Sequence, residues 1–246
     1  MINFLFRKRK PPLNLAIIGT DIHSHLVAGI DDGSNSVETS LELMKKMADM
    51  GFKKIITTPH VMSGQYPNTS QDILNGLDSL KAALQNADTD MSVLAAAEYF
   101  LDEDFLKLLD SKDLLTLPNN HLLVEMSLLS PFDGLDDYLF KIALKGYATI
   151  LAHPERYVYY HNNYAAYEEL KEKGLLFQVN ILSLLGYYGT HTQKIAYRLV
   201  KDNMVELLGT DIHNMKHANY IKENIVNKEF QNILSKYEFQ NSTLFS

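Results

Sequence analysis

Short apolar runs that each end in a polar side chain recur seven times along this chain of 246 residues. Consecutive runs are separated by about the length of one strand-plus-helix unit, and amphipathic stretches fill the gaps. The runs are Leu15–Ile18, Lys54–Thr58, Ser92–Ala97, Leu122–Val124, Ala148–Ala152, Leu175–Val179 and Val205–Leu208. Helices are predicted over Val37–Met50, Asp72–Ala87, Leu135–Leu144, Tyr164–Lys173 and Thr192–Asp202. This alternation predicts parallel strands covered by helices.

The polar residues that follow the runs narrow the fold class further. They are Asp21, His23 and His25, then His60, Glu98, Glu125, His153, Asn180, and finally Asp211 with His213. The carboxyl ends of all strands meet at one mouth in a β/α barrel, whereas an open doubly wound sheet would not bring them together. Seven units instead of eight predict a single-domain α/β fold, a distorted (β/α)7 TIM-like barrel over residues 14–246.

The first residues differ in character from the rest. Residues 1–13 are predicted to be a flexible leader, apolar first and basic second, which Pro11 and Pro12 separate from the barrel. A frayed terminus is one interpretation. The other is a weak peripheral contact of residues 2–10 with an anionic membrane surface. No apolar stretch of about 18 residues is present, so no membrane-spanning segment is expected.

Composition excludes several kinds of chemistry. The chain has no cysteine, which rules out cysteine nucleophiles, zinc–thiolate sites and disulfides and fits a cytoplasmic location. Its net charge of −7 argues against nucleic acid as a partner, because such binding depends on Lys and Arg that neutralise phosphates. A nuclease is therefore a weak hypothesis.

Histidines and carboxylates at the predicted mouth indicate a metal centre. His23 and His25 are two residues apart, so on an extended segment both rings face one side. Asp211 and His213 repeat this spacing at the last strand, which lies beside the first if the barrel closes. Imidazole and carboxylate suit borderline divalent metals. Together with His60, Glu98, Glu125, His153, and Asp31 or Asp32, the inventory suits two or three ions. Four other histidines are interpreted as structural: His121, His161, His191 and His217.

Five sequence blocks resemble a known family. They are DIHSHLVAGIDDG over 21–33, Thr58-Pro59-His60, Ala97-Glu98, His153-Pro154-Glu155-Arg156, and Gly209-Thr210-Asp211-Ile212-His213. Together they resemble the polymerase-and-histidinol-phosphatase (PHP) superfamily, and the IDDG and HPER segments are similar to its bacterial capsular and exopolysaccharide branch of metal-dependent protein-tyrosine phosphatases. The resemblance covers about residues 15–215 and implies a distorted barrel that holds three divalent ions, manganese favoured, with iron, zinc or magnesium as alternatives.

The resemblance also implies roles for individual residues. His23, His25, Glu98 and Asp211 would hold the first ion, Glu98 would bridge to a second held with Glu125 and His153, and Asp32, His60 and His213 would hold the third. Arg156, Asp211 and His213 are the predicted catalytic residues, with Arg156 binding phosphate. A second family arginine, a few residues after the last histidine, is missing, and Lys216 is the candidate replacement.

The implied function is hydrolysis of phosphotyrosine on a protein by a metal-bound hydroxide. The implied partner is a membrane tyrosine autokinase that controls capsule or exopolysaccharide synthesis, which would place the chain in the cytoplasm at the inner membrane surface. Two alternatives remain open: a small-molecule phosphomonoesterase such as histidinol phosphatase, and a noncatalytic metal-binding partner of a kinase.

Overall fold

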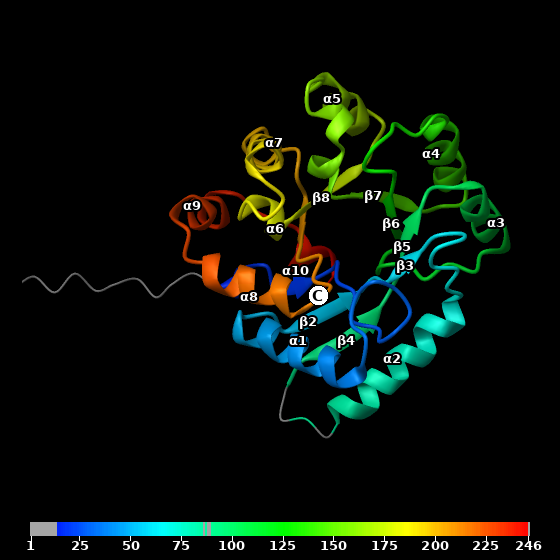
Figure 1. Ribbon diagram of the computed structural model, residues 1–246. Coiled ribbons are helices and arrows are strands. Elements are labelled where there is room, and N and C mark those ends of the chain that lie inside the picture. The colour runs from blue at the N-terminus through cyan, green and yellow to red at the C-terminus, as the bar shows by residue number, and fades with distance from the viewer. Residues whose placement is uncertain (1–13, 86, 88–89, 246) are drawn as a thin grey trace, which may run out of the picture.

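A curled parallel sheet lies at the centre of the computed structural model, with helices packed around its outside (Figure 1). The structure describes residues 14–85, 87 and 90–245. Its strands are β1 (Thr20–Asp21), β2 (Lys54–Thr57), β3 (His60–Val61), β4 (Ser92–Ala95), β5 (Glu98–Phe100), β6 (His121–Glu125), β7 (Ala148–Ala152), β8 (Leu176–Asn180) and β9 (Leu207–Gly209).

Two ladders make up this sheet, in the orders β1-β2-β4 and β3-β5-β6-β7-β8-β9, and every pair of strands is parallel. The two ladders follow one another in a single curved sheet, because β2 runs on into β3 after Thr58 and Pro59 and β4 runs on into β5 after two alanines. Proline has no N–H to donate, so the ladder breaks at this point. The last strand position meets the first through a parallel bridge between Ser24 and Ile212. The predicted distorted barrel with seven strand positions is confirmed.

Helices connect the strands on the outer surface. Ser36 caps α1, and Thr69 with Asp72 forms a capping box at the start of α2, so both helices begin at sequence-encoded signals. The helices are α1 (Val37–Asp49), α2 (Ser70–Leu84), α3 (Glu103–Ser111), α4 (Leu135–Leu144), α5 (Ala165–Glu172), α6 (Ile181–Leu184), α7 (Thr190–Lys201), α8 (Met215–Asn224), α9 (Lys228–Lys236) and α10 (Asn241–Leu244). Three short 3-10 helices complete the described chain: Leu15–Ile17, Pro154–Arg156 and Val158–Tyr160.

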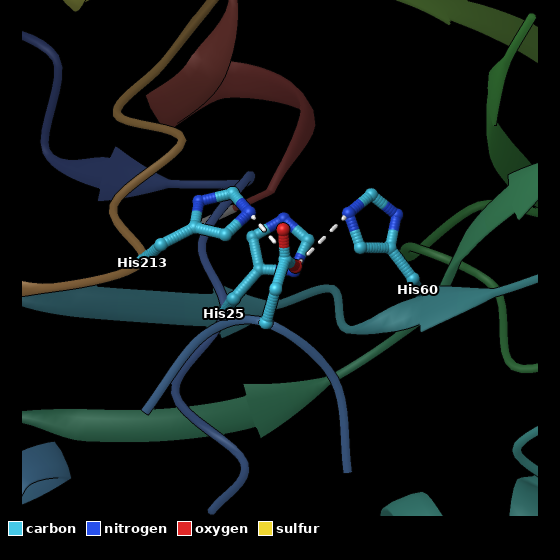
Figure 2. A group of neighbouring side chains, drawn as sticks. His25, His60 and His213 are labelled. Atoms are coloured by element: carbon cyan, nitrogen blue, oxygen red, sulfur yellow. Dashed lines mark ion pairs between the residues drawn. The ribbon is translucent and has the colours of Figure 1, made fainter. Parts of the chain in front are cut away.

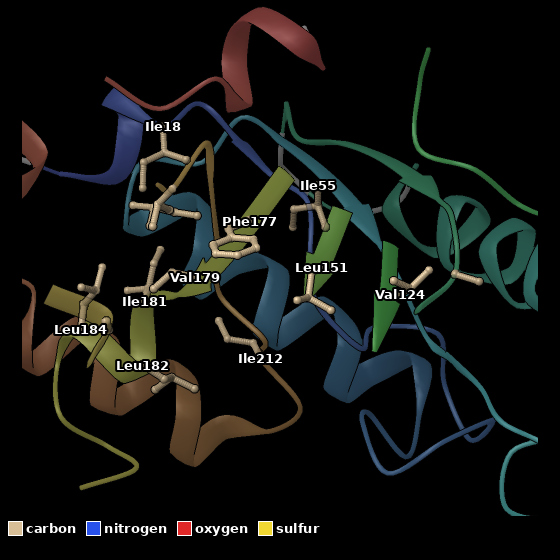
Figure 3. Packing of buried hydrophobic residues seen from close by; sticks show 14 of the residues in the cluster. Ile18, Ile55, Val124, Leu151, Phe177, Val179, Ile181, Leu182, Leu184 and Ile212 are labelled. Atoms are coloured by element: carbon tan, nitrogen blue, oxygen red, sulfur yellow. The ribbon is translucent and has the colours of Figure 1, made fainter. Parts of the chain in front are cut away.

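The core has two layers because successive strand residues face opposite sides. Ile55, Leu151 and Val179 belong to the larger cluster, between strands and helices (Figure 3). Their neighbours Ile56 and Ile150 belong to a smaller cluster that fills the inside of the barrel. Phe245, fully buried, joins this inner cluster, which also contains Ile22, Ala96, Leu117, Leu123, Ala152 and Leu207.

Some predictions about the elements need correction. The apolar run Leu15–Ile18 is not a strand: its first residues form a 3-10 helix, and β1 begins only at Thr20. The left-handed backbone of Gly19, with φ 75°, separates the two elements. The predicted leader of residues 1–13 and its membrane-contacting segment 2–10 lie outside the described residues. None of the described helices is long and apolar enough to cross a membrane.

Candidate metal centre

His23 and His25 extend from the end of β1 toward one point at the mouth of the barrel. His23 Nε2 lies 3.1 Å from Glu98 Oε2 and 3.5 Å from Asp211 Oδ1. His25 Nε2 lies 3.5 Å from each of the same two oxygens. All four side chains are buried. The structure therefore brings together the four residues predicted for the first ion, from the beginning, middle and end of the sequence.

The Glu98 carboxylate faces two neighbouring groups of side chains. Its Oε1 atom lies 3.0 Å from His153 Nε2, while its Oε2 atom lies 3.1 Å from His60 Nδ1. Glu125 adds a second carboxylate here, 2.9 Å from His60 Nδ1 and 3.8 Å from His153 Nε2. This is the arrangement that a bridging carboxylate between two ions requires.

A third group forms on the solvent side around Asp32. Figure 2 shows the rings of His25, His60 and His213 around one carboxylate. Asp32 Oδ1 lies 3.3 Å from His213 Nε2 and 3.5 Å from His60 Nε2. Asp32 is half exposed, unlike the deeper carboxylates. With this group, all nine predicted ligand residues lie in clusters whose ligand atoms are within 4.8 Å of one another.

Asp31, the other candidate in the first loop, has a different position. Its Oδ2 atom lies 2.8 Å from His25 Nδ1 and accepts a hydrogen bond from the His60 backbone N–H. Its Oδ1 atom accepts from Gly33 N–H. Although burial opposes ionisation, the attraction of His25 and these hydrogen bonds lower the pKa of Asp31 to about 2. Asp31 thus supports the side chains around it, and Asp32 is the carboxylate that faces the cluster.

Unsatisfied atoms show that the cluster fits a cation. Six buried atoms among the predicted ligands have no partner in hydrogen-bond geometry: His23 Nε2, His25 Nε2, His60 Nδ1, Glu98 Oε2, Glu125 Oε1 and His153 Nδ1. Such atoms are costly unless something binds them. Burial lowers the pKa of His23 and His60, yet the attraction of Glu98, reinforced by Asp211 or Glu125, outweighs it and raises both pKa values to about 10. The cluster therefore stabilises positive charge, as a divalent ion site does.

Two of the predicted ligands have a strained backbone. His153 has φ 36° and ψ 55°, and Asp211 has φ 51°, in the left-handed region that residues other than glycine rarely occupy. Such conformations persist where the surroundings impose them, often at functional sites. Sequence reasoning found both residues but not their strained backbones.

A cavity of about 820 Å³ opens above the cluster. Arg156 lines it; its Nη1 donates to Asp211 Oδ2 at 3.0 Å, and its guanidinium lies 4.3 Å from the ring centroid of Tyr188. Lys216 is exposed on α8, with Nζ 5.6 Å from the ring centroid of Tyr187, and is not among the lining residues. His217, interpreted from the sequence as structural, does line the cavity.

Aromatic and apolar residues form much of the remaining cavity wall, beside Gln65, Ser127 and Asn214, and sequence reasoning did not identify them. Tyr66 stacks on His60 with ring centroids 5.4 Å apart. The other apolar or aromatic lining residues are Met62, Phe100, Met126, Leu128, Leu129 and Tyr188. No periodic pattern marks them, because all except Phe100, the last residue of β5, lie outside the named helices and strands.

Comparisons with known proteins agree with this geometry. A family model described as "Capsular polysaccharide synthesis, CpsB/CapC" matches residues 19–238. Tyrosine-protein phosphatase YwqE of Bacillus subtilis is 30% identical over 232 residues, covering 91% of this chain and 90% of YwqE. Tyrosine-protein phosphatase CpsB of Streptococcus pneumoniae is 27% identical over 201 residues, covering 79% and 83%.

Solved structures show the same relationship. A structure from a study of B. subtilis YwqE and S. pneumoniae CpsB, described as unique metal-dependent tyrosine phosphatases, superposes with a TM-score of 0.81 at 26% identity, covering 92% of this chain and 94% of the other. Histidinol phosphate phosphatase of Lactococcus lactis superposes with a TM-score of 0.54 at 13% identity, covering 84% and 92%, and shares the fold alone.

Proposed function

Because the chain belongs to the CpsB/CapC family of capsular polysaccharide synthesis, we propose that it is a metal-dependent phosphatase that hydrolyses phosphotyrosine on proteins. The observation that carries this proposal is the position of Arg156. Its guanidinium lines the same cavity as His60, Glu125, His153, Asp211 and His213, so one phosphate group can contact both the cation cluster and an arginine. The names of YwqE and CpsB as tyrosine-protein phosphatases support this choice of substrate.

The nine clustered residues are the proposed metal ligands, in the three groups described above. Four of them are carboxylates: Asp32, Glu98, Glu125 and Asp211. Three divalent ions, manganese favoured, would bring +6 against −4 and leave a local charge of about +2, which suits a phosphate dianion. Bound ions supply Lewis acidity that lowers the pKa of water toward about 7 and neutralises phosphate oxygens.

Arg156 is the proposed phosphate ligand of the protein itself. Asp211 holds its Nη1, and the Tyr188 ring supports the guanidinium plane, so the group is oriented before substrate arrives. The remaining N–H groups of the guanidinium suit bidentate binding of phosphate oxygens. An oriented donor stabilises the charge that develops on those oxygens during phosphoryl transfer.

The apolar wall favours an aromatic ester. Leu129 is 83% exposed although it lines the cavity, and Leu128 and Tyr66 lie in the same wall. A phosphotyrosine ring would cover this apolar surface, whereas an alkyl phosphate would leave it exposed to water. The tyrosine leaving group needs little protonation because its pKa is near 10. The chain has no cysteine, so no cysteinyl phosphate forms.

The proposed protein substrate is a membrane tyrosine kinase of the capsule or exopolysaccharide system. A flexible tyrosine-bearing segment can enter an open cavity without unfolding a domain. This places the protein in the cytoplasm, and residues 2–10 would add a weak, salt-sensitive contact with the inner membrane surface. Liposome co-sedimentation of the full chain and a chain starting at Pro11 tests the contact; equal sedimentation would refute it.

Kinetics with matched substrates test the activity. Metal-loaded protein should hydrolyse a phosphotyrosine peptide and p-nitrophenyl phosphate, and kcat/KM should be far lower for histidinol phosphate. Leu129→Ala should raise KM for the peptide several-fold, while Leu144→Ala, an equally apolar exposed site on α4 outside the cavity lining, should not. A preference for histidinol phosphate would favour the small-molecule alternative. Metal binding without any turnover would favour the noncatalytic one.

A further inference from the structure

A buried chain of amide groups joins two of the proposed metal ligands through the neighbouring strand β8. His23 Nδ1 lies 2.6 Å from Gln178 Oε1. Gln178 Nε2 donates to Asn180 Oδ1 at 2.9 Å, and Asn180 Nδ2 donates to Asp211 Oδ2 at 2.6 Å. All four side chains are buried, and Gln178 and Asn180 have no exposed surface. Both amides project from β8 on the same side, since they are two residues apart.

The direction of every hydrogen bond in this chain follows from its last member. An ionised Asp211 carboxylate only accepts, so Asn180 must present its NH2 group there and its oxygen to Gln178. Gln178 must then present its NH2 group to Asn180 and its oxygen to His23. An amide oxygen only accepts, so His23 Nδ1 must carry a hydrogen. The lone pair of His23 is consequently available at Nε2, the atom that faces Glu98 and Asp211.

We propose that Gln178 and Asn180 are positioning residues that fix the tautomer and ring orientation of His23 so that its Nε2 atom binds metal. This inference rests on the metal centre of the proposed function but is independent of the substrate. The partner of the second ring nitrogen commonly sets the tautomer of a metal-binding histidine. Here Gln178 is that partner, and Asn180, which accepts from Gln178, also donates to the Oδ2 atom of Asp211 and leaves Oδ1 toward the cluster.

A glycine makes room for this chain. A Cβ atom at Gly209 on β9 would lie 2.6 Å from Gln178 Nε2 and 2.7 Å from the His23 Cβ. Real Cβ atoms do not approach other atoms so closely, so any larger residue would displace either the amide or the imidazole. The backbone of β9 thus leaves the space that the Gln178–His23 contact occupies.

An amide also suits this position better than a carboxylate. His25 has the carboxylate of Asp31 on its second nitrogen, at a partly buried site beside the mouth. Gln178 lies deeper, beside the apolar cluster inside the barrel, and Asn180 and Asp211 follow it. A further buried carboxylate there would carry an unpaired charge, which is costly. An amide transmits the hydrogen-bond direction without adding charge.

Zinc, used as a diamagnetic probe ion, tests the proposal in the full chain. In zinc-loaded, 15N-labelled protein, long-range 1H–15N correlation should show the proton of His23 on Nδ1 and a metal-bound Nε2. A proton on Nε2, or zinc on Nδ1, would overturn the proposal. This measurement needs no substitution, so it decides even if a variant fails to fold.

Variants of Gln178 give a second readout. Gln178→Met keeps the volume but removes the acceptor, and zinc affinity measured by chelator competition should fall 10- to 100-fold. Gln178→Glu restores the acceptor for His23 but adds a buried charge and removes the donor to Asn180, so it should recover only part of that loss. Gln71→Leu, at an exposed site on α2, is the control and should match the parent.

The outcomes separate two failures. If Gln178→Met binds zinc within about twofold of the parent, the positioning role is wrong. If the parent itself binds no zinc, manganese or iron, the metal centre of the proposed function is wrong, and the positioning role falls with it.

Discussion

The carboxylate of Asp31 contacts the second ring nitrogen of His25: Asp31 Oδ2 lies 2.8 Å from His25 Nδ1. The same oxygen accepts the backbone N–H of His60, so one side chain orients parts of two proposed ligands. Gly33 completes the arrangement: its N–H donates to Asp31, and a Cβ there would lie 2.4 Å from the His25 Cβ. The IDDG segment therefore supports the proposed metal centre and also contains one proposed ligand, Asp32.

Removing this support should weaken metal binding. Asp31→Ala leaves the His25 ring without its partner, and we expect a 10- to 100-fold loss of metal affinity, the usual effect of losing such a contact. Isothermal titration of metal-free protein measures it. Asp78→Ala, at an exposed position of α2, should have no effect, and an unchanged affinity in Asp31→Ala would show that His25 needs no support.

Loss of a proposed direct ligand should reduce metal binding more severely. His23→Ala removes a nitrogen that lies 3.1 Å from Glu98 and 3.5 Å from Asp211, so metal content should drop and turnover should nearly disappear. Elemental analysis with p-nitrophenyl phosphate kinetics is the measurement. His191→Ala, whose ring stacks on His161 away from the cavity lining, is the matched control. Normal metal content in His23→Ala would remove His23 from the centre.

Substitution of Arg156 should lower the rate of hydrolysis without changing the metal content. Lys retains the charge but cannot reproduce the bidentate fork, so Arg156→Lys should cost about 2–4 kcal/mol of transition-state stabilisation, roughly 30- to 1,000-fold in kcat/KM. Arg198, on α7, forms an exposed ion pair with Asp202. Arg198→Lys is therefore the control and should keep the parent kcat/KM. Parent-like kinetics in Arg156→Lys would make Arg156 a structural residue.

The histidine pKa values predict how pH acts on the metal-free protein. His23 and His60 have pKa values of about 10 in the folded chain, above the ordinary value near 6.5. Their protonated forms therefore stabilise the fold fully below about pH 6.5, and this stabilisation is lost as pH rises through about 10. Bound metal replaces these protons, so the loaded protein should not show the loss.

Thermal unfolding between pH 6 and pH 10 checks this prediction. The Tm of chelator-treated protein should fall toward pH 10 more steeply than that of the loaded protein, which controls for other titrating groups. Apparent metal affinity should rise over the same range, since binding displaces protons. Parallel Tm curves would contradict the assignment of these histidines as protonated in the absence of metal.

Phe245 provides a test of the fold itself. Its ring is fully buried in the cluster inside the barrel, so Phe245→Ala should lower the free energy of unfolding by about 3–5 kcal/mol. Urea denaturation monitored by circular dichroism measures the change. Phe140→Ala, whose ring is 65% exposed on α4, should cost far less. Equal effects would mean that Phe245 does not fill the barrel in solution.

The sequence was most informative where periodicity and chemistry coincide. β7 and α4 begin and end at the predicted residues, and the polar residues after the strands meet at one mouth as expected. Leu15–Ile18 was misassigned because a short apolar run has no periodicity that separates a strand from a helical turn. The sequence pattern does not predict helices α3, α6, α8, α9 and α10.

Contacts between distant segments were beyond sequence reasoning. Nothing in the spacing of Asp31 and Asp32 says which one faces the cluster, because the loop conformation decides it. Gln178 and Asn180 lie on a predicted strand, but only the fold shows that they reach His23 and Asp211. Lys216 follows the last ligand closely in sequence, yet α8 places it outside the cavity lining.

The C-terminal residues join the first strand, β1, to the last strand, β9, and this has a consequence for biosynthesis. Asn241 donates to the backbone carbonyls of both Thr20 and Leu208, and Phe245 packs into the barrel beneath them. While Asn241 and Phe245 of a nascent chain are still inside the ribosome, the chain lacks these contacts between β1 and β9. His23 and Asp211 are far apart in the sequence, so we expect the proposed ligand set to assemble only after most of the described residues have been translated.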